Sequence, residues 1–166
     1  YYDDQDPNHR RLFKPLSYQT VELYTTNGKL LLTGVILKVG FKTSPKDSVV
    51  EISGYSSTGI LGDCNIPTSI YPLEFNNLSI KQIAEKVCKP FGIRVAIEND
   101  GGKASETIPE VTADKKQTAA GFLVELTAQR NLIITNDQYG NLVITKTKEN
   151  QKSIATYTDG IPSLGI

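Results

Sequence analysis

The chain has few residues of the kinds that usually carry chemistry: among its 166 residues there is one histidine, there are two cysteines, and methionine and tryptophan are absent. A zinc site needs about four clustered Cys, His or carboxylate ligands. Cys64 and Cys88 are far apart and belong to no C-x-x-C motif. We therefore predict no metal ligands and no cofactor, and we expect the cysteines to be buried, reduced thiols rather than a disulfide.

The sequence also lacks the motifs of the common catalytic sites. His9 lies in a polar segment with no apolar framework to position it for a Ser-His-Asp arrangement. Residues 54–62 are glycine-rich but lack both the G-K-[ST] ending of a phosphate-binding loop and the second glycine of a nucleophile elbow. Asp4 and Asp6 begin like a calcium loop, but Pro15 stands where its last ligand, a glutamate, belongs. We predict no catalytic residues and no enzyme.

An excess of one charge is also missing, because 18 Lys and Arg balance 18 Asp and Glu. Proteins that bind nucleic acid usually carry a basic excess that displaces counterions from phosphates, so we expect no specific nucleic-acid partner. No apolar run approaches the roughly 18–20 residues of a membrane span, so no membrane insertion is expected. Because the chain does not begin with methionine, we interpret it as a fragment or a processed product.

What the sequence does contain is, first, a set of strand signals after a polar start. Residues 1–18 have no periodicity and are expected to form an N-terminal arm or loop. Apolar and polar residues alternate over 19–53, and Asn27-Gly28 is a strong hairpin signal. With a further turn at 44–47, these residues predict an antiparallel meander of about four strands. We assign residues 19–75 to a β-barrel-like domain. Residues 63–77, which cross its end, are expected to be irregular.

An α+β domain is predicted for residues 76–149. Ser79 and Gln82 form a capping box before a helix over 79–88, whose apolar residues recur at helical spacing and which leads into a strand at 93–97. A mobile connection is expected at 98–113, then a second helix at 115–129 and a hairpin of 132–135 with 142–146. The two helix–strand units align at an offset of 39 residues, which leaves open whether they are a structural repeat. Residues 150–166 are interpreted as the incomplete start of a second barrel.

Three motifs occur in the chain in a specific order. They are a strand and turn (Val50-Glu51-Ile52-Ser53-Gly54-Tyr55-Ser56-Ser57-Thr58-Gly59, leading to Asp63-Cys64), a helix and strand (Ile83-Ala84 followed by Cys88-Lys89-Pro90-Phe91-Gly92-Ile93), and a hairpin (Thr135-Asn136 followed by Gly140-Asn141-Leu142-Val143-Ile144-Thr145-Lys146). Together they resemble the Mu-like phage baseplate hub family, which is related to phage late control protein D. Tyr55 stands where that family usually has arginine.

The resemblance implies a structural protein of the contractile-tail baseplate in the virion, assembled in the host cytoplasm. It implies a homotrimeric ring whose subunits each give two barrel-like domains, and partners that are the tail tube and the central spike proteins. The hub of a bacterial contractile injection system is an alternative that the sequence does not separate from a phage hub. A carbohydrate-binding module of the cell wall is an alternative of another class. The eight tyrosines could stack on sugars, but they are scattered along the sequence, which favours ordinary surface and interface roles.

Overall fold

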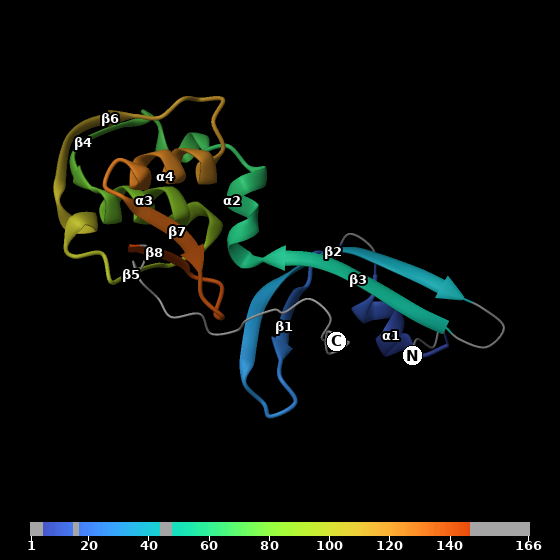
Figure 1. The fold of residues 1–166 in the computed structure, drawn as a ribbon. Helices are drawn as coiled ribbons and strands as arrows, with labels where there is room; N and C mark the ends of the chain where they lie inside the picture. The colour runs from blue at the N-terminus through green and yellow to red at the C-terminus, as the bar shows by residue number, and fades with distance from the viewer. Residues whose placement is uncertain (1–4, 15–16, 44–47, 147–166) are drawn as a thin grey trace, which may run out of the picture.

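A computed structural model describes residues 5–14, 17–43 and 48–146 of the chain. Figure 1 shows two parts, a long three-stranded sheet with a short helix beside it and a compact α+β unit, with helix α2 where they meet. No helix in the described ranges is long and apolar enough to cross a membrane.

The sheet contains β1 (Thr20–Tyr24), β2 (Leu30–Thr43) and β3 (Ser48–Ser56) in the order β1-β2-β3, with both pairs antiparallel. The predicted hairpin at Asn27-Gly28 is confirmed. The Gly28 N–H donates to the Thr25 carbonyl at 2.9 Å, and Gly28 has a φ of +81°, which the missing Cβ makes accessible.

The meander is smaller and more open than predicted. Leu30–Thr43 is one continuous strand, so residues 19–53 contain three strands instead of about four. The register of the β2–β3 pair shifts between Ile36 and Lys38, because Leu37 is an extra, bulged residue. β1 pairs only with the first half of β2, and within the described residues the outer edges of β1 and β3 have no strand partner. The described residues therefore form an open sheet and no closed barrel, and closure stays a prediction.

The expected N-terminal arm or loop contains a helix, α1 (Pro7–Leu12). The Asp6 side chain accepts a hydrogen bond from the Asn8 N–H at 2.8 Å, and Pro7 occupies the first turn, where its missing N–H costs nothing. The expectation of a loop is wrong here because a helix of six residues is too short to produce a visible apolar period.

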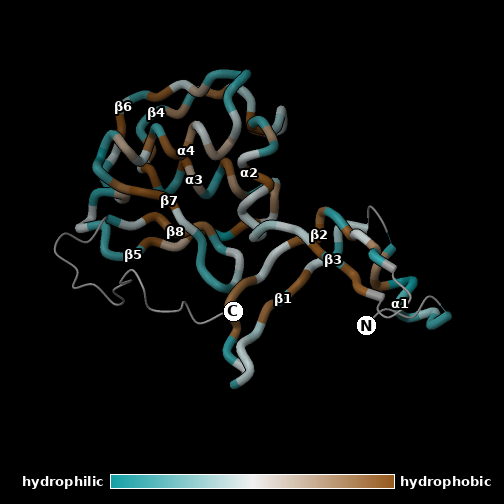
Figure 2. The backbone as a smooth tube through the Cα atoms, turned by 45° about the vertical axis from the view of Figure 1, so that its right-hand side comes forward, coloured by the Kyte–Doolittle hydropathy of each residue, from teal (hydrophilic) through white to brown (hydrophobic). Residues whose placement is uncertain are grey.

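The α+β unit follows without a linker. Its elements are η1 (Ser57–Gly59), α2 (Ile60–Asp63), η2 (Thr68–Ile70), β4 (Glu74–Ser79), α3 (Ile80–Cys88), η3 (Lys89–Phe91), β5 (Val95–Glu98), η4 (Lys103–Ser105), β6 (Thr107–Thr112), α4 (Ala119–Ala128), β7 (Leu132–Asn136) and β8 (Leu142–Lys146). β4 pairs with β6, and β5-β8-β7 forms a mixed sheet in which β5 runs parallel to β8. Figures 1 and 2 show α3 and α4 between these two layers.

Helix α3 follows its sequence signals closely. The Gln82 N–H donates to the Ser79 Oγ at 3.3 Å, and the Gln82 side chain accepts from the Ser79 N–H at 2.9 Å, so the capping box is confirmed. The residues of the predicted stripe are all fully buried: Ile80, Ile83, Ala84, Val87 and Cys88. This stripe faces the interior of the α+β unit.

The second helix–strand unit is confirmed with a later start. Thr118, not residue 115, caps α4 by accepting a hydrogen bond from the Gly121 N–H at 3.1 Å. Ser79 and Thr118 thus cap two helices at the offset of 39 residues seen in the sequence. The strands after them, β5 and β7, lie on opposite sides of β8. The two units therefore correspond in local structure and contribute to one sheet.

The hydrophobic core lies wholly within the α+β unit, because the buried apolar residues of the described chain fall between Leu61 and Ile144. Helix α4 contributes Phe122, whose ring stacks on that of Phe75 from β4 with centroids 5.7 Å apart. Burial of apolar surface is the main favourable contribution to the folding of a domain. Leu61 and Phe75 precede residue 76, so part of the segment assigned to the barrel-like domain packs in this core.

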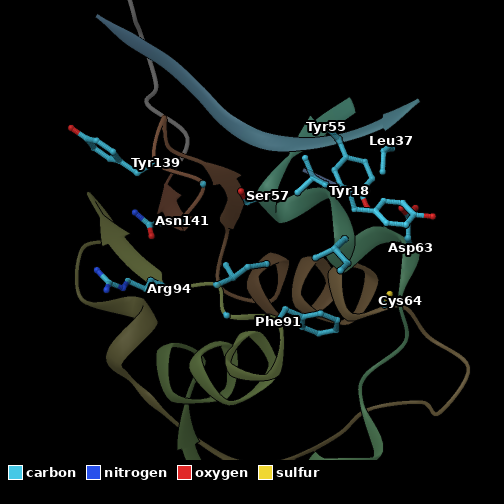
Figure 3. A pocket seen from close by; sticks show the side chains of 15 residues that line it. Tyr18, Leu37, Tyr55, Ser57, Asp63, Cys64, Phe91, Arg94, Tyr139 and Asn141 are labelled. Carbon is cyan, nitrogen blue, oxygen red and sulfur yellow. The ribbon is translucent and has the colours of Figure 1, made fainter. Parts of the chain in front are cut away.

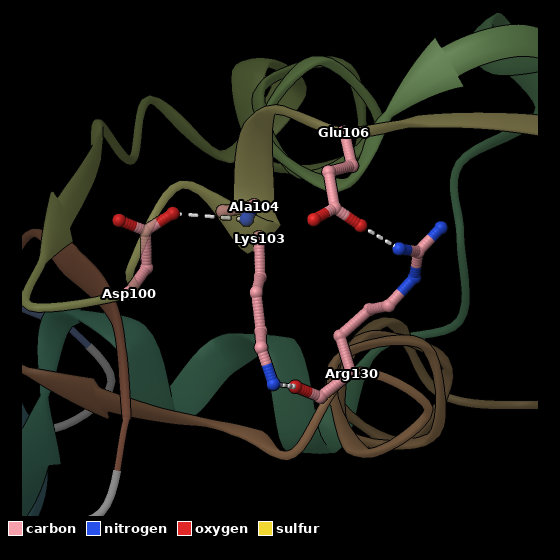
Figure 4. Close-up of polar contacts among 5 residues, drawn as sticks. All are labelled: Asp100, Lys103, Ala104, Glu106 and Arg130. Carbon is pink, nitrogen blue, oxygen red and sulfur yellow. Dashed lines mark hydrogen bonds and ion pairs between the residues drawn. The ribbon is translucent and has the colours of Figure 1, made fainter.

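The segment 98–113 was expected to be a mobile connection without regular structure, but it contains η4 and β6. Figure 4 shows polar contacts made by Asp100, Lys103 and Glu106 of this segment. Ala104 is fully buried, and its N–H donates to the Asp100 carboxylate at 2.9 Å. Arg130, in the turn before β7, forms an ion pair with Glu106, and Lys103 donates to the Arg130 carbonyl. These contacts fasten the segment to the α4–β7 turn. The expected irregular region 63–77 likewise contains the start of β4.

Candidate interaction site

The three-stranded sheet has two chemically different faces. Directly opposed residues of an antiparallel pair lie on the same face, and the register pairs Leu23 with Leu32 and Val39 with Ile52. One face consequently carries apolar side chains on all three strands, with Gly34, Gly54 and Ser56 among them. We call it the apolar face, and its residues are Val21, Leu23, Leu32, Ile36, Val39, Phe41, Val50 and Ile52.

The apolar face is not covered by the α+β unit. Leu23 is 50% exposed and Ile52 is 46% exposed, and no apolar side chain of the described residues before Leu61 is buried. Figure 2 shows hydrophobic stretches along β1, β2 and β3 at a distance from the compact unit. Exposed apolar patches of this extent usually mark a surface that a further layer of protein covers.

The opposite face of the sheet docks on the α+β unit through the β7–β8 turn. The Thr33 hydroxyl donates to the Gln138 carbonyl at 2.8 Å, and the Ser57 hydroxyl donates to the Thr33 carbonyl at 3.4 Å. Gly140 completes this contact. It has a φ of +80°, and a Cβ at this position would lie 2.7 Å from the Ser57 Oγ. The sheet therefore docks on the unit through a turn in which any side chain at position 140 would be strained.

A cleft of about 970 Å³ lies beside this contact, between β2 and β3 on one side and η3 and the β7–β8 turn on the other. Tyr18, Tyr55 and Tyr139 line it together with Phe91 and Arg94. In Figure 3, Tyr18, Tyr55, Leu37 and Asp63 lie toward one end, and Tyr139, Asn141 and Arg94 lie toward the other. Burial raises the pKa of Tyr55, and the hydrogen bond to Asp63 raises it further. We call this hollow the interdomain cleft.

The interdomain cleft was not predicted from the sequence. Three of the tyrosines that are scattered along the sequence line it, because the docking of the sheet brings their segments together. The signals that could have found it are Gly140 and the neighbouring residues of the hairpin turn, which look like an ordinary turn sequence until their contact with Thr33 is seen.

Several residues were considered from the sequence for catalysis or metal binding and rejected. The structure does not bring these residues together at one site. His9 lies in α1, with its Nε2 3.8 Å from the Asp6 carboxylate. Asp4 lies outside the described residues. Cys64 and Cys88 are free thiols, of which only Cys88 is buried, and burial raises its pKa to about 12. Among the residues that the structure describes, no three His, Cys, Asp or Glu side chains are grouped so that they could hold a metal ion.

Comparison with known proteins decides the family. Residues 58–146, more than half of the chain, match the family model described as baseplate hub protein gp44-like, second domain. The chain belongs to the gp44-like baseplate hub family. The match begins in η1 and ends at the last residue of β8, so it spans the α+β unit and leaves the three-stranded sheet outside it. The resemblance drawn from the three sequence motifs is thus confirmed.

The chain is similar to several Mu-like tail proteins. It is 26% identical over 120 residues to the baseplate hub protein gp44 of Escherichia phage Mu, which covers 72% of this chain and 31% of that protein. The 43 kDa tail protein of prophage MuSo2 from Shewanella oneidensis is 33% identical, with a TM-score of 0.62 over 75% of this chain and 37% of the other.

A tail protein from Neisseria meningitidis MC58 has the same fold, with a TM-score of 0.67 at 20% identity over 79% of this chain and 38% of the other. The chain therefore spans about a third of the length of these gp44-like and tail proteins.

Proposed function

We propose that this chain is a structural component of the central baseplate hub of a contractile phage tail, located in the virion and without enzymatic activity. In this role it connects the tail tube to the central spike, and it assembles as a homotrimeric ring in the host cytoplasm. Membership of the gp44-like family supports the baseplate role. The observation that carries the assembly is the uncovered apolar face of the three-stranded sheet.

The sheet has the properties expected of one part of a composite barrel. Among the described residues, the outer edges of β1 and β3 have no strand partner, and the second half of β2 pairs only with β3. Open strand edges are sites where further strands add, and a sheet of three strands with an uncovered apolar face is marginal by itself. We propose that additional strands close this sheet into the predicted barrel in the assembled ring.

The proposed arrangement divides the chain into the predicted units. These are an arm at 1–18, a β unit at 19–75, an α+β unit at 76–149 and a following segment at 150–166, which lies outside the described residues. The packing of Leu61 and Phe75 in the α+β core supports moving the division between the β unit and the α+β unit toward residue 57. The net charge of zero suits a ring lumen through which DNA passes without adhering.

The test is the oligomeric state of the complete gene product, measured by light scattering. We expect a trimer. Leu23→Lys places a charge in the middle of the apolar face and should give monomers, whereas Val124→Lys is a matched control at an equally exposed position on α4 and should remain trimeric. A monomeric wild-type protein at concentrations where virions assemble would refute the ring. Peptidoglycan pull-down by such a monomer would favour the carbohydrate-binding alternative.

A further inference from the structure

The interdomain cleft has no role in the ring as proposed above, since the apolar face lies on the other side of the sheet. Its lining is nevertheless unusual for a surface hollow. Tyrosine and arginine, with tryptophan, are the residue types enriched where binding energy concentrates in protein interfaces. The cleft contains three tyrosines, Phe91 and Arg94. Such a lining requires an explanation beyond the packing of the sheet on the α+β unit.

We propose that the interdomain cleft is the docking site for an extended segment of another tail protein, one that inserts an apolar or aromatic side chain between the tyrosines and sets a carboxylate against Arg94. This inference rests on the proposed hub function and adds a second contact surface to it, distinct from the apolar face.

The aromatic wall of the cleft is fixed before any partner arrives. Gly59 lies directly against the Tyr55 ring, and a Cβ on Gly59 would be 2.4 Å from the Tyr55 Cγ. The Tyr55 hydroxyl is hydrogen-bonded to the Asp63 carboxylate at the rim. A ring that packs against Gly59 and is hydrogen-bonded through its hydroxyl loses little conformational freedom on binding, so more of the contact energy is available as affinity.

Tyr18 adds an independent sign of function. It has a φ of +45°, in the left-handed region that bulky side chains seldom adopt, and the residue is 57% exposed. The exposed side chain gains little from burial that would offset the strain in its backbone. Strained residues of this kind concentrate at ligand-binding positions, and Tyr18 lines the cleft next to Tyr55 (Figure 3).

The charges in the cleft indicate what the partner carries. Asp63 already accepts the Tyr55 hydroxyl. Arg94, at the other end, is exposed, and among the described residues its guanidinium has no ion pair. A guanidinium presents a planar set of donors that matches a carboxylate. The cleft volume of about 970 Å³ is larger than one side chain needs, which fits several residues of an extended segment.

The test is photo-crosslinking in assembled tail particles. Benzoylphenylalanine replaces Tyr139, which is 63% exposed in the cleft, or, as the control, Val124, which is 50% exposed on α4. We expect a crosslink from position 139, absent from position 124, to a peptide of another tail protein with Asp or Glu within a few residues. Arg94→Glu should reduce this crosslink at least tenfold, and Arg94→Lys should reduce it less.

The possible outcomes separate the two proposals. If the protein is incorporated into particles but position 139 gives no crosslink, or crosslinks to a segment without a carboxylate, the docking site is refuted and the hub role stands. If the protein is absent from tail particles, the hub role and the docking site are both refuted. Binding of a peptidoglycan fragment to the purified complete gene product that is lost on Tyr139→Ala would also overturn the proposal, because the cleft would then be a sugar site.

Discussion

Replacement of Ile83 by alanine tests how the α+β unit is held together. The Ile83 side chain is fully buried at the centre of the α3 stripe. The substitution removes about three buried methyl or methylene groups at about 0.8 kcal/mol each, and the cavity left behind adds to that cost. We expect the free energy of unfolding to fall by about 2–4 kcal/mol.

Urea denaturation followed by circular dichroism measures this change, and the slope of the transition should stay constant if the unfolded state is unaffected. For a domain of about 100 residues the same loss lowers Tm by roughly 10–30 °C. Lys81→Ala is the matched control on the same helix. The Lys81 side chain is 46% exposed and approaches Glu85 at 4.0 Å, so its removal should cost less than about 0.5 kcal/mol.

Equal losses from Ile83→Ala and Lys81→Ala would refute the assignment of the buried face. A loss below about 1 kcal/mol for Ile83→Ala, with the control unchanged, would mean that the core around α3 is loosely packed and collapses around the smaller side chain.

Three further predictions concern the sheet, its contact with the α+β unit and the thiols. Leu23→Lys should change the stability of this 166-residue chain by under about 0.5 kcal/mol in urea, because Leu23 is half-exposed; a larger loss would show that the apolar face is already covered. Gly140→Ala should lower the free energy of unfolding by about 1–2 kcal/mol, because position 140 has a positive φ and the new Cβ would clash with Ser57. Amide exchange in η1 should become faster, and unchanged exchange would contradict the docking contact. A thiol reagent should modify native Cys64 and spare Cys88 until the protein unfolds. Burial raises the pKa of Cys88 from 9.0 to about 12, so the free energy of unfolding should fall as the pH rises from about 9 toward 12. This fall should be smaller in Cys88→Ala.

The elements that the sequence predicted well are those with local signals. The start of α3 follows from Ser79 and Gln82, and its buried stripe from the spacing of apolar residues, all within one short segment. The same holds for the β7–β8 hairpin. Local capping and periodicity decide such elements because the interactions that stabilise them lie a few residues apart.

The elements that were missed depend on partners distant in sequence. In the β4–β6 pair, Leu78 is opposite Ile108, and neither strand has a turn or an alternation that identifies it alone. Gly101 and Gly102 suggested mobility over 98–113, but the Asp100 carboxylate and the buried Ala104 hold that turn. The interdomain cleft was missed for the same reason, since it arises from the contact of Thr33 with Gln138.

The position of β8 also has a consequence for how the chain folds during synthesis. β8 is the last strand of the described chain and the central strand of its sheet, where Val95 pairs with Leu142 in parallel and Ile134 pairs with Ile144 in antiparallel. Helices α3 and α4 emerge from the ribosome before β8, the strand that completes the core beneath them. The pairing of Val95 with Leu142 is non-local, and such pairing slows folding. A chain stopped before Leu142 lacks the central strand of the sheet, so it should remain without a stable core. The α+β unit should therefore form in one late, cooperative step.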